Sequence, residues 1–482
     1  MNLIQALANA IRLPELRNKI LFTGGMLIVF RLFANVAIPG ASHAALSQLF
    51  NSQPLLGLLD LFSGGGLSTF SIVAMGMNPF INATIIMQLM TVISERIKEI
   101  SKQGEEGRRR IQRWSRYLTV LLGAGQAYGF TVLFQSTSPA ILGPLDIFQR
   151  SEIVLVLTAG TVMLMWFGEL ITEYGIGNGI SLIIFAGIIG RGPQGVAAVF
   201  AAANPNGAGI SAYVPFIVFG LIAIVTTAVI IEVQQAVRKI PIQSAQRTVG
   251  LKQVASRASF LPIRVNHAGV IPIIFAISVM FLPTIVANYF VGAPSGTWYY
   301  KAATWVNGNF SPTTSNVPMA ITYNALYFLL TFGFTYFYTA ITFETTDVAD
   351  NLKRFASFIP GIRPGPPTGA YLAAVMNRIT FEVNDVADNL KRYSSFIPGI
   401  RPGRPTADYL ASVMNRVTFA GATFLGFITV ILPIATSTIS GINRQQMYLG
   451  GTAILIVVGV ALDTMKQLQT QLVMRQYRGF IK

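Results

Sequence analysis

The chain has 482 residues, of which 52% are hydrophobic and only 11% are charged, and it contains no cysteine. Soluble domains carry about 25% charged residues, so this composition excludes a disordered chain, a coiled coil and an ordinary soluble enzyme. The lack of cysteine excludes disulfides, cysteine-ligated zinc, iron–sulfur clusters and a cysteine nucleophile. The composition indicates a polytopic membrane protein, and its net charge of +16 must be interpreted from where the charges lie.

Ten segments have the apolar length to cross a membrane, which takes about 20 residues as a helix. In chain order we predict spans at 20–38, 71–93, 117–135, 152–171, 180–203, 213–231, 268–291, 319–341, 417–435 and 447–462. Arg191-Gly192-Pro193 interrupts the fifth, so we expect a broken helix there. Residues 1–19 are predicted to form a short amphipathic helix that lies on the membrane surface and ends at Pro14.

Lysine and arginine are segregated between the loops. Thirty of the 35 lie in the N-terminal segment, the C-terminal tail and the loops after spans two, six and eight. Positive residues mark the cytoplasmic side, so we expect both termini to be cytoplasmic. The loop Glu169–Gly179 after span four lacks lysine and arginine, and only the alternation of the spans places it on that side. The positive charge is therefore mainly a topology signal, which makes a soluble nucleic-acid-binding protein a poor interpretation.

Residues 343–380 and 381–418 repeat each other, with 29 of 38 positions identical. Each copy is polar and lacks an apolar run of span length, so neither adds a crossing. Two copies are too few for a solenoid. The repeat is either a local duplication, natural or artefactual, or a doubled cytoplasmic docking surface.

The segment Leu55–Phe70 is apolar and rich in glycine, but it is too short to span the membrane. Glycines 64–66 can form a hinge, because glycine adopts backbone angles that other residues avoid. Irregular backbone at membrane depth is tolerated only inside protein or beside a water-filled cavity. We interpret the segment as a half-helix lodged in a pore, with a helix on the outer surface as the alternative.

The predicted spans carry little charge, although buried charge usually marks an ion-coupled transporter. The candidates are Arg31, Arg191, Glu232 and Asp463, of which the last two lie at cytoplasmic helix ends. The sequence shows no proton relay, nucleophile–base pair, paired-carboxylate site or metal-ligand spacing. We therefore expect no catalytic residue, no metal and no cofactor. Bulky aliphatic residues beside glycine or proline at mid-depth could instead form a constriction that blocks ions by dewetting.

Seven motifs follow one another between the ten spans. They are Phe62–Gly66, Met77–Ile86, Gly104–Arg109, Glu173–Ser181, Ala268–Ala276, Phe358–Gly365 with its copy at 396–403, and Val458–Asp463. In this order they resemble the SecY/Sec61-alpha family, the central channel subunits of Sec protein translocons. The resemblance extends from about Leu13 to Phe480.

This resemblance implies an all-α polytopic fold of ten transmembrane helices, in two pseudo-symmetric five-helix halves related as an inverted repeat around an hourglass pore. The N-terminal half would cover 20–203, with a plug half-helix at 55–70. The C-terminal half would cover 213–462, with cytoplasmic loops at 236–266 and 343–416. Residues 1–19 and the tail 463–482 would be cytoplasmic, and a lateral gate would lie between spans two–three and seven–eight.

The family's functional positions map onto this chain by motif. The plug maps onto Leu58, Leu59, Leu61, Phe62, Ser63, Gly64, Gly65, Gly66 and Leu67. The hydrophobic pore ring maps onto Met77, Ile81, Ile188, Ile274, Ser278 and Ile456. Basic docking positions map onto Arg247 and Lys252 after span six, and onto Arg363 or its duplicate Arg401 after span eight.

The resemblance implies a protein-conducting channel of the bacterial cytoplasmic membrane that is not an enzyme. It would pass unfolded secretory polypeptides across the membrane and membrane proteins laterally into it. The implied partners are SecE- and SecG-type subunits, a SecA-type ATPase, the ribosome, clients bearing signal sequences, membrane lipid, and accessory SecDF and YidC-type proteins. The alternative is an inverted-repeat secondary transporter of a small solute, which the interrupted fifth span fits but the missing coupling carboxylates oppose.

Overall fold

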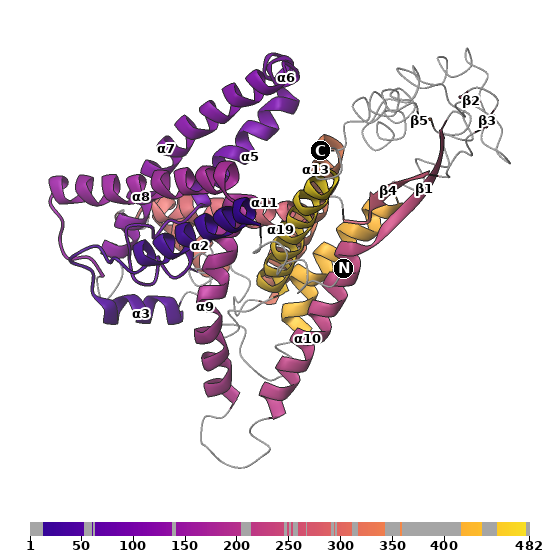
Figure 1. Cartoon of the computed structure of the whole chain (residues 1–482). Helices are drawn as coiled ribbons and strands as arrows, with labels where there is room; N and C mark the ends of the chain where they lie inside the picture. The colour runs from indigo at the N-terminus through magenta and orange to yellow at the C-terminus, as the bar shows by residue number, and fades with distance from the viewer. Residues whose placement is uncertain are drawn as a thin grey trace. The chain divides into compact units, whose positions relative to one another are not determined.

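The computed structural model describes residues 13–52, 60, 63–136, 141–203, 214–244, 248–249, 252–253, 259–266, 268–290, 294, 296–310, 317–342, 357–358, 416–435 and 451–478. This part of the chain is mostly helical, with a few strands in two small sheets (Figure 1). The chain divides into two units. The first unit comprises Met1–Thr227, Ile274–Phe328 and Ile428–Lys482, and the second comprises Ala228–Ile273 and Leu329–Phe427.

Each of the ten predicted spans coincides with a helix. These helices are α2 (Pro14–Ala34), α5 (Asn78–Ile93), α7 (Glu105–Ser136), α8 (Ile147–Tyr174), α9 (Gly179–Ala203), α10 (Val214–Gln235), α11 (Ile271–Asn288), α13 (Val317–Thr342), Arg416–Ala435 and α19 (Gly451–Arg478). Shorter helices are α3 (His43–Ser52), α6 (Glu95–Lys102) and α12 (Trp298–Asn309). The prediction of an all-α polytopic membrane protein is confirmed.

Among the described helices, seven are individually long and apolar enough to cross a membrane. They are α7, α8, α9, α10, α13, the helix Arg416–Ala435 and α19. Helix α5 passes the same test together with α6, across a bend of 105° at Ser94, while α11 is apolar but shorter. The bend separates an apolar helix from one that is charged, because the sequence changes at Glu95.

Three predictions about the spans are wrong, two about where a helix begins and one about a break within a helix, each for a local reason. The first helix begins at Pro14 instead of 20, because proline suits the first helical turn, where its missing N–H is not needed. The second begins at Asn78, after turns at 71–77. The fifth, α9, is continuous although Pro193 lies inside it. Packed neighbours can compensate for the lost backbone hydrogen bond of a proline in a membrane helix.

Glycines allow very close approach between elements of the first unit. A methyl group added at Gly160 of α8 would lie 2.0 Å from the carbonyl oxygen of Ile72. One added at Gly179, where α9 begins, would lie 2.0 Å from the carbonyl oxygen of Gly168 in α8. Small residues at helix interfaces in membranes let backbones approach in this way. The packing of α8 thus depends on positions that have no side chain.

We predict that Gly160→Ala destabilises the protein by about 1–3 kcal/mol, because the added methyl overpacks a backbone contact. Thermal unfolding of the detergent-solubilised protein would measure this loss. Gly220→Ala on α10 is the matched control, because nothing lies within 4 Å of the methyl it adds. An equal effect of the two substitutions would contradict the packing argument.

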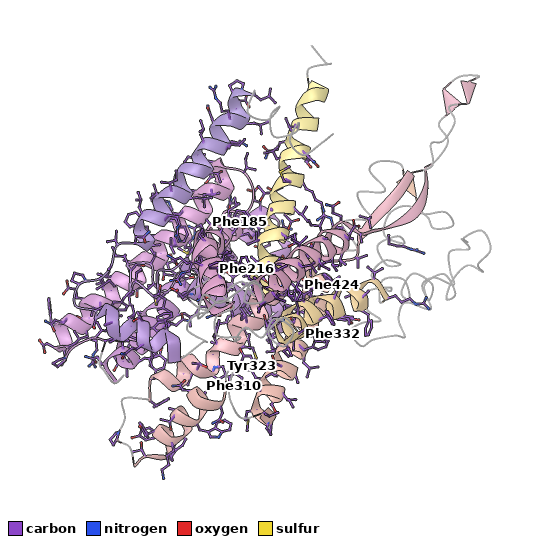
Figure 2. All side chains as sticks on the ribbon, turned by 90° about the horizontal axis from the view of Figure 1, so that it is seen from below. Phe185, Phe216, Phe310, Tyr323, Phe332 and Phe424 are labelled. Atoms are coloured by element: carbon purple, nitrogen blue, oxygen red, sulfur yellow. The ribbon has the colours of Figure 1, made fainter. Side chains whose placement is uncertain are left out.

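Aromatic and aliphatic contacts connect other elements of the first unit. Phe310, which caps α12, meets Tyr323 of α13 edge to face, with ring centroids 5.2 Å apart (Figure 2). A separate buried cluster joins Leu16 of α2 and Ile176, between α8 and α9, to two leucines of α19, Leu468 and Leu472. The first and last described helices of the chain are therefore held together.

The second unit contains the strands. Strand β1 (Val237–Ser244) pairs antiparallel with β4 (Ser259–Arg264), and Val237 lies opposite Arg264. Strand β5 (Ser357–Phe358) pairs with the other edge of β1, and β2 (Thr248–Val249) pairs with β3 (Lys252–Gln253). The basic loop predicted at 236–266 therefore contains paired strands. Apart from β5, the repeat lies outside the described residues up to Arg416.

Candidate functional site

The glycine-rich segment 55–70, here called the plug segment, is buried where the structure describes it. Asp60, Ser63 and Phe70 are fully buried, and Leu67 is 1% exposed. Such burial contradicts the alternative of a helix on the outer surface. The predicted plug residues Leu58, Leu59, Leu61 and Phe62 lie outside the described residues.

Two glycines shape the plug segment. Gly64 and Gly65 have φ angles of +69° and +93°, in the left-handed region that favours glycine. The N–H of Gly65 donates to the carbonyl oxygen of Asp60 over 3.0 Å, which closes a turn. A methyl group added at Gly64 would lie 2.9 Å from the ring of Phe30 in α2 and 3.0 Å from the Cα of Gly187 in α9. The segment is therefore wedged against both helices.

The end of the plug segment is bound to the last residue of α2 and to the residues that follow this helix. The hydroxyl of Thr69 donates to the carbonyl oxygen of Ala34 over 3.0 Å. The N–H of Ile38 donates to the carbonyl oxygen of Phe70 over 2.9 Å. The Phe70 ring meets Phe134 of α7 edge to face at 5.3 Å. These contacts fix one end of the segment between α2 and α7.

A buried ion pair also holds the plug segment, at Asp60. The fully buried carboxylate of Asp60 pairs with Arg191 of α9, whose side chain is 16% exposed. The second carboxylate oxygen of Asp60 accepts the backbone N–H of Ser68 over 2.8 Å. Arg191 also donates to the hydroxyl of Ser68. The charge of Asp60 is thus bonded both to α9 and within the plug segment.

A second arginine contacts the plug segment through its backbone. Arg31 of α2 donates to the carbonyl oxygen of Gly64 in the plug segment and, over 3.3 Å, to that of Gly190 in α9. A methyl group at Gly190 would lie 2.5 Å from the guanidinium carbon of Arg31, and one at Gly65 would lie 2.9 Å from Nε of Arg191. Glycines therefore make room for both guanidinium groups.

Sequence reasoning identified Arg31 and Arg191 as charges within spans but did not find their shared environment. It missed Asp60, the carboxylate that pairs with Arg191. The available signal was one acidic residue inside an apolar segment, together with an arginine in each of two apolar spans. An intramembrane charge usually has a partner, so the three could have been considered together.

The six predicted ring residues are all buried, from 0% exposed at Ile456 to 7% at Ile274. Met77 caps the start of α5 and Ile81 lies in its first turn. Ile274 and Ser278 share one face of α11, because they are four residues apart. Ile188 lies three residues before Arg191 on α9, so one helix face carries a predicted ring residue and the ion partner of the plug segment.

The predicted docking residues are only partly described. Lys252 lies in β3, opposite Val249 of β2. Arg247, Arg363 and Arg401 lie outside the described residues. Within the described ranges, no group of His, Asp and Glu is suited to hold a metal ion.

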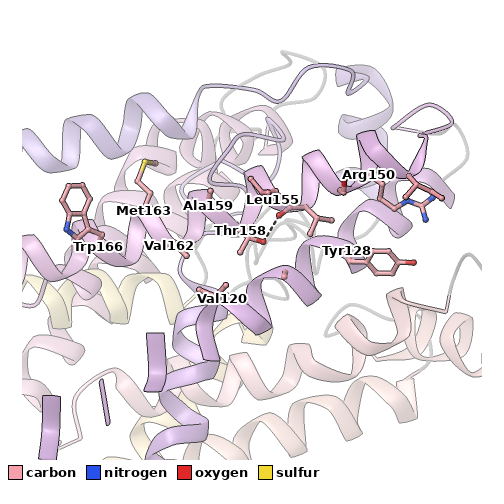
Figure 3. Close-up of a pocket in the computed structure, with 13 residues that line it drawn as sticks. Val120, Tyr128, Arg150, Leu155, Thr158, Ala159, Val162, Met163 and Trp166 are labelled. Atoms are coloured by element: carbon pink, nitrogen blue, oxygen red, sulfur yellow. Dashed lines mark hydrogen bonds between the residues drawn. The ribbon is translucent and has the colours of Figure 1, made fainter. Parts of the chain in front are cut away.

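An apolar groove of about 940 Å³ lies between α7 and α8 (Figure 3). Its lining extends along α8 from Ile147 to Trp166. At one end Arg150 lies 6.0 Å from the ring centroid of Tyr128 and donates to Gln135 over 2.8 Å. The groove shares no lining residue with the plug segment or the predicted ring.

Tyr289, directly after α11, packs against α7. Its ring stacks on Tyr128 with centroids 6.1 Å apart. A methyl group added at Gly125 would lie 3.0 Å from its hydroxyl, and one at Gly129 would lie 3.5 Å from its ring. Gly125 and Gly129 are four residues apart on α7, so they form a flat strip beneath the tyrosine. We call this contact the α7–Tyr289 seam.

A set of apolar helices with a buried, glycine-rich segment packed among them defines a polytopic membrane protein. The SecY family model matches residues 71–383 and, again, 378–465. The protein translocase subunit SecY of Halalkalibacterium halodurans is 39% identical over 484 residues, which cover 100% of both chains. The chain belongs to the SecY family. The second, overlapping match is consistent with the repeat at 343–418.

Two solved structures share this fold. One, described as a protein conducting channel, has a TM-score of 0.60 and 17% identity, with 95% of this chain and 93% of that chain covered. The other has a TM-score of 0.58 and 19% identity, with 95% of this chain and 92% of that chain covered. Its description says that the plug domain of the SecY protein stabilises the closed state of the translocation channel and maintains a membrane seal. The predicted ten-helix all-α architecture agrees with the SecY fold.

Proposed function

We propose that this chain is the protein-conducting channel subunit of a Sec-type translocon. It passes unfolded polypeptides across the membrane and membrane proteins laterally into it. The observation that carries the proposal is the buried plug segment held by α2 and α9, in a chain 39% identical to a SecY translocase subunit over its whole length. The alternative of a secondary transporter loses one of its supports, because the fifth span is a continuous helix.

Met77, Ile81, Ile188, Ile274, Ser278 and Ile456 form the pore ring of this proposal. Two findings support it: all six are buried, and Ile188 lies one turn from the plug contact on α9. An apolar constriction excludes ions by dewetting. It can also fit varied side chains of a client without binding them, which suits a conduit for many sequences.

The lateral gate of the proposal lies between α5–α7 and α11–α13. The α7–Tyr289 seam supports this position, because a single aromatic side chain covers two glycines of α7 there. A contact of that kind can separate without breaking a buried ion pair. The gate would open at this seam to let a client helix enter lipid.

The proposed setting is the bacterial cytoplasmic membrane, with both termini and the loops 236–266 and 343–416 in the cytoplasm. Arg247, Lys252 and Arg363 or Arg401 would bind phosphates of ribosomal RNA or acidic groups of a SecA-type ATPase through charge-assisted contacts.

The groove along α8 would receive a helix of a SecE- or SecG-type subunit. From Ile147 to Trp166 it covers about 28 Å at the rise of an α-helix, close to the hydrocarbon thickness.

The test is a crosslinking trap. The protein is reconstituted with SecE- and SecG-type partners and given a stalled secretory chain that carries a photoreactive residue at successive positions. We expect crosslinks to run from the basic loops through Ile81, Ile188 and Ile456, and to vanish for a client without a signal sequence. Crosslinks confined to the loops, with saturable uptake of a small solute, would favour the transporter instead.

A further inference from the structure

We propose that Asp60, Arg191 and Arg31 form an ionic latch that holds the plug segment in its closed position. Arg191 and Arg31 are then positioning residues, which act on the pore through the plug segment. The inference rests on the proposed channel function and assigns the closed state of that channel to particular side chains. Three elements meet in the latch: α2 supplies Arg31, α9 supplies Arg191, and the plug segment supplies Asp60 and the carbonyl oxygen of Gly64.

Because the ion pair is buried, it fixes the position of the plug segment against α9. Asp60 is fully buried, and a buried carboxylate is costly unless it is paired and hydrogen-bonded. Arg191 supplies the pairing charge, while the N–H of Ser68 supplies a hydrogen bond from inside the segment. The segment cannot move away from α9 without separating these charges. Removing one partner leaves the other charge buried and uncompensated.

Arg31 provides a second attachment that does not depend on the carboxylate. It donates to carbonyl oxygens on both sides of the contact, Gly64 in the plug segment and Gly190 in α9. A methyl group added at Gly64 would lie 3.0 Å from the Cα of Gly187, so the plug segment packs closely on the backbone of α9. Arg31 therefore bridges the plug segment and α9.

The charges of the latch do not cancel, since two arginines surround one carboxylate. When the plug segment leaves, Asp60 and Gly64 leave with it, and both guanidinium groups lose a bonding partner. Water can replace those partners only once the interior is hydrated, because unpaired charge is stable in water and not in an apolar interior. The latch therefore opposes opening of a dry pore more strongly than opening of one already wetted by a client.

The experiment measures resting ion conductance in planar bilayers, together with client translocation in vesicles. Asp60→Asn and Arg191→Gln should each raise resting conductance about tenfold or more, because each removes the ionic partner of a charge that is buried or nearly so. The double variant should leak less than either single variant, since it leaves neither charge unpaired. Arg191→Lys keeps the charge and should leak less than Arg191→Gln.

Arg116→Gln and Glu169→Gln are the matched controls, because they break a half-buried pair between α7 and α8 with a distance of 2.8 Å. These controls should leave the resting conductance unchanged. Single variants that do not leak, or a double variant that leaks as much as the two singles combined, would overturn the latch. Failure of the unaltered protein to translocate clients would instead refute the channel function on which the latch rests.

Discussion

A short thiol-specific crosslinker between cysteines at Gly129 and Tyr289 should reduce both client translocation and lateral membrane insertion about tenfold or more, because gate opening must precede both. The Tyr289 ring lies against Gly129 and stacks on Tyr128, so the two positions are close in the closed seam. Opening the proposed gate separates α7 from α11. A covalent link across the seam prevents that separation. The native chain has no cysteine, so no other thiol reacts.

The control is a cysteine pair at Phe22 of α2 and Tyr174, the last residue of α8. Their rings meet edge to face with centroids 6.2 Å apart, so these two positions are also close, and neither lines the groove along α8. Both helices lie on the same side of the proposed gate, and crosslinking them should leave translocation intact. Vesicle translocation assays with and without the crosslinker compare the pairs. Normal transport through a channel linked at 129 and 289 would refute the gate position.

Replacing Ile81 or Ile188 by asparagine should raise the resting ion conductance about tenfold or more, because a polar side chain lets water enter a constriction that excludes ions by being dry. Ile81 is 5% exposed and Ile188 1%. The two residues belong to different helices, α5 and α9, so a leak from both would identify a shared constriction. Single-channel recording in planar bilayers measures the effect.

Ile189→Asn is the matched control for this prediction. Ile189 is the neighbour of Ile188 on α9 but is 48% exposed, so its side chain lies at the surface of the protein and not in its interior. The control should assemble in the membrane and remain tight to ions. Two results would refute the assignment of Ile81 and Ile188 to the ring. One is an equal ion leak through the Ile188→Asn and Ile189→Asn variants, and the other is no ion leak through the Ile81→Asn and Ile188→Asn variants.

The helical architecture could be predicted because a helix needs about 20 apolar residues to cross the bilayer, and apolar segments of that length can be found in the sequence. The errors occurred where local chemistry decided the boundary. Proline in the first turn let α2 begin at Pro14, and turns at 71–77 delayed the start of α5. The strands β1 and β4 were missed for a similar reason: Pro241 inside β1 argues against a strand in sequence alone.

The candidate site was predictable only in part. Glycines 64–66 indicated that the backbone takes unusual angles there, and the positive φ angles of Gly64 and Gly65 bear this out, while the hinge stays a prediction. The ion pair between Asp60 and Arg191 was not predicted, because the two residues are far apart in the chain and only the tertiary fold brings them together. The ring and docking assignments came from motif resemblance, and they stay predictions.

The cluster of Leu16, Ile176, Leu468 and Leu472 has a consequence for biosynthesis. Helix α2, the first described helix, completes this packing only when α19, the last described helix, has been made. The first unit is assembled from three separate stretches of chain, so its nascent form must persist while the second unit is synthesised. Contacts between distant parts of a chain form late and leave apolar surface exposed meanwhile. A chain that terminates before α19 would keep Leu16 and Ile176 uncovered, which gives membrane quality control a means to distinguish unfinished copies from finished ones.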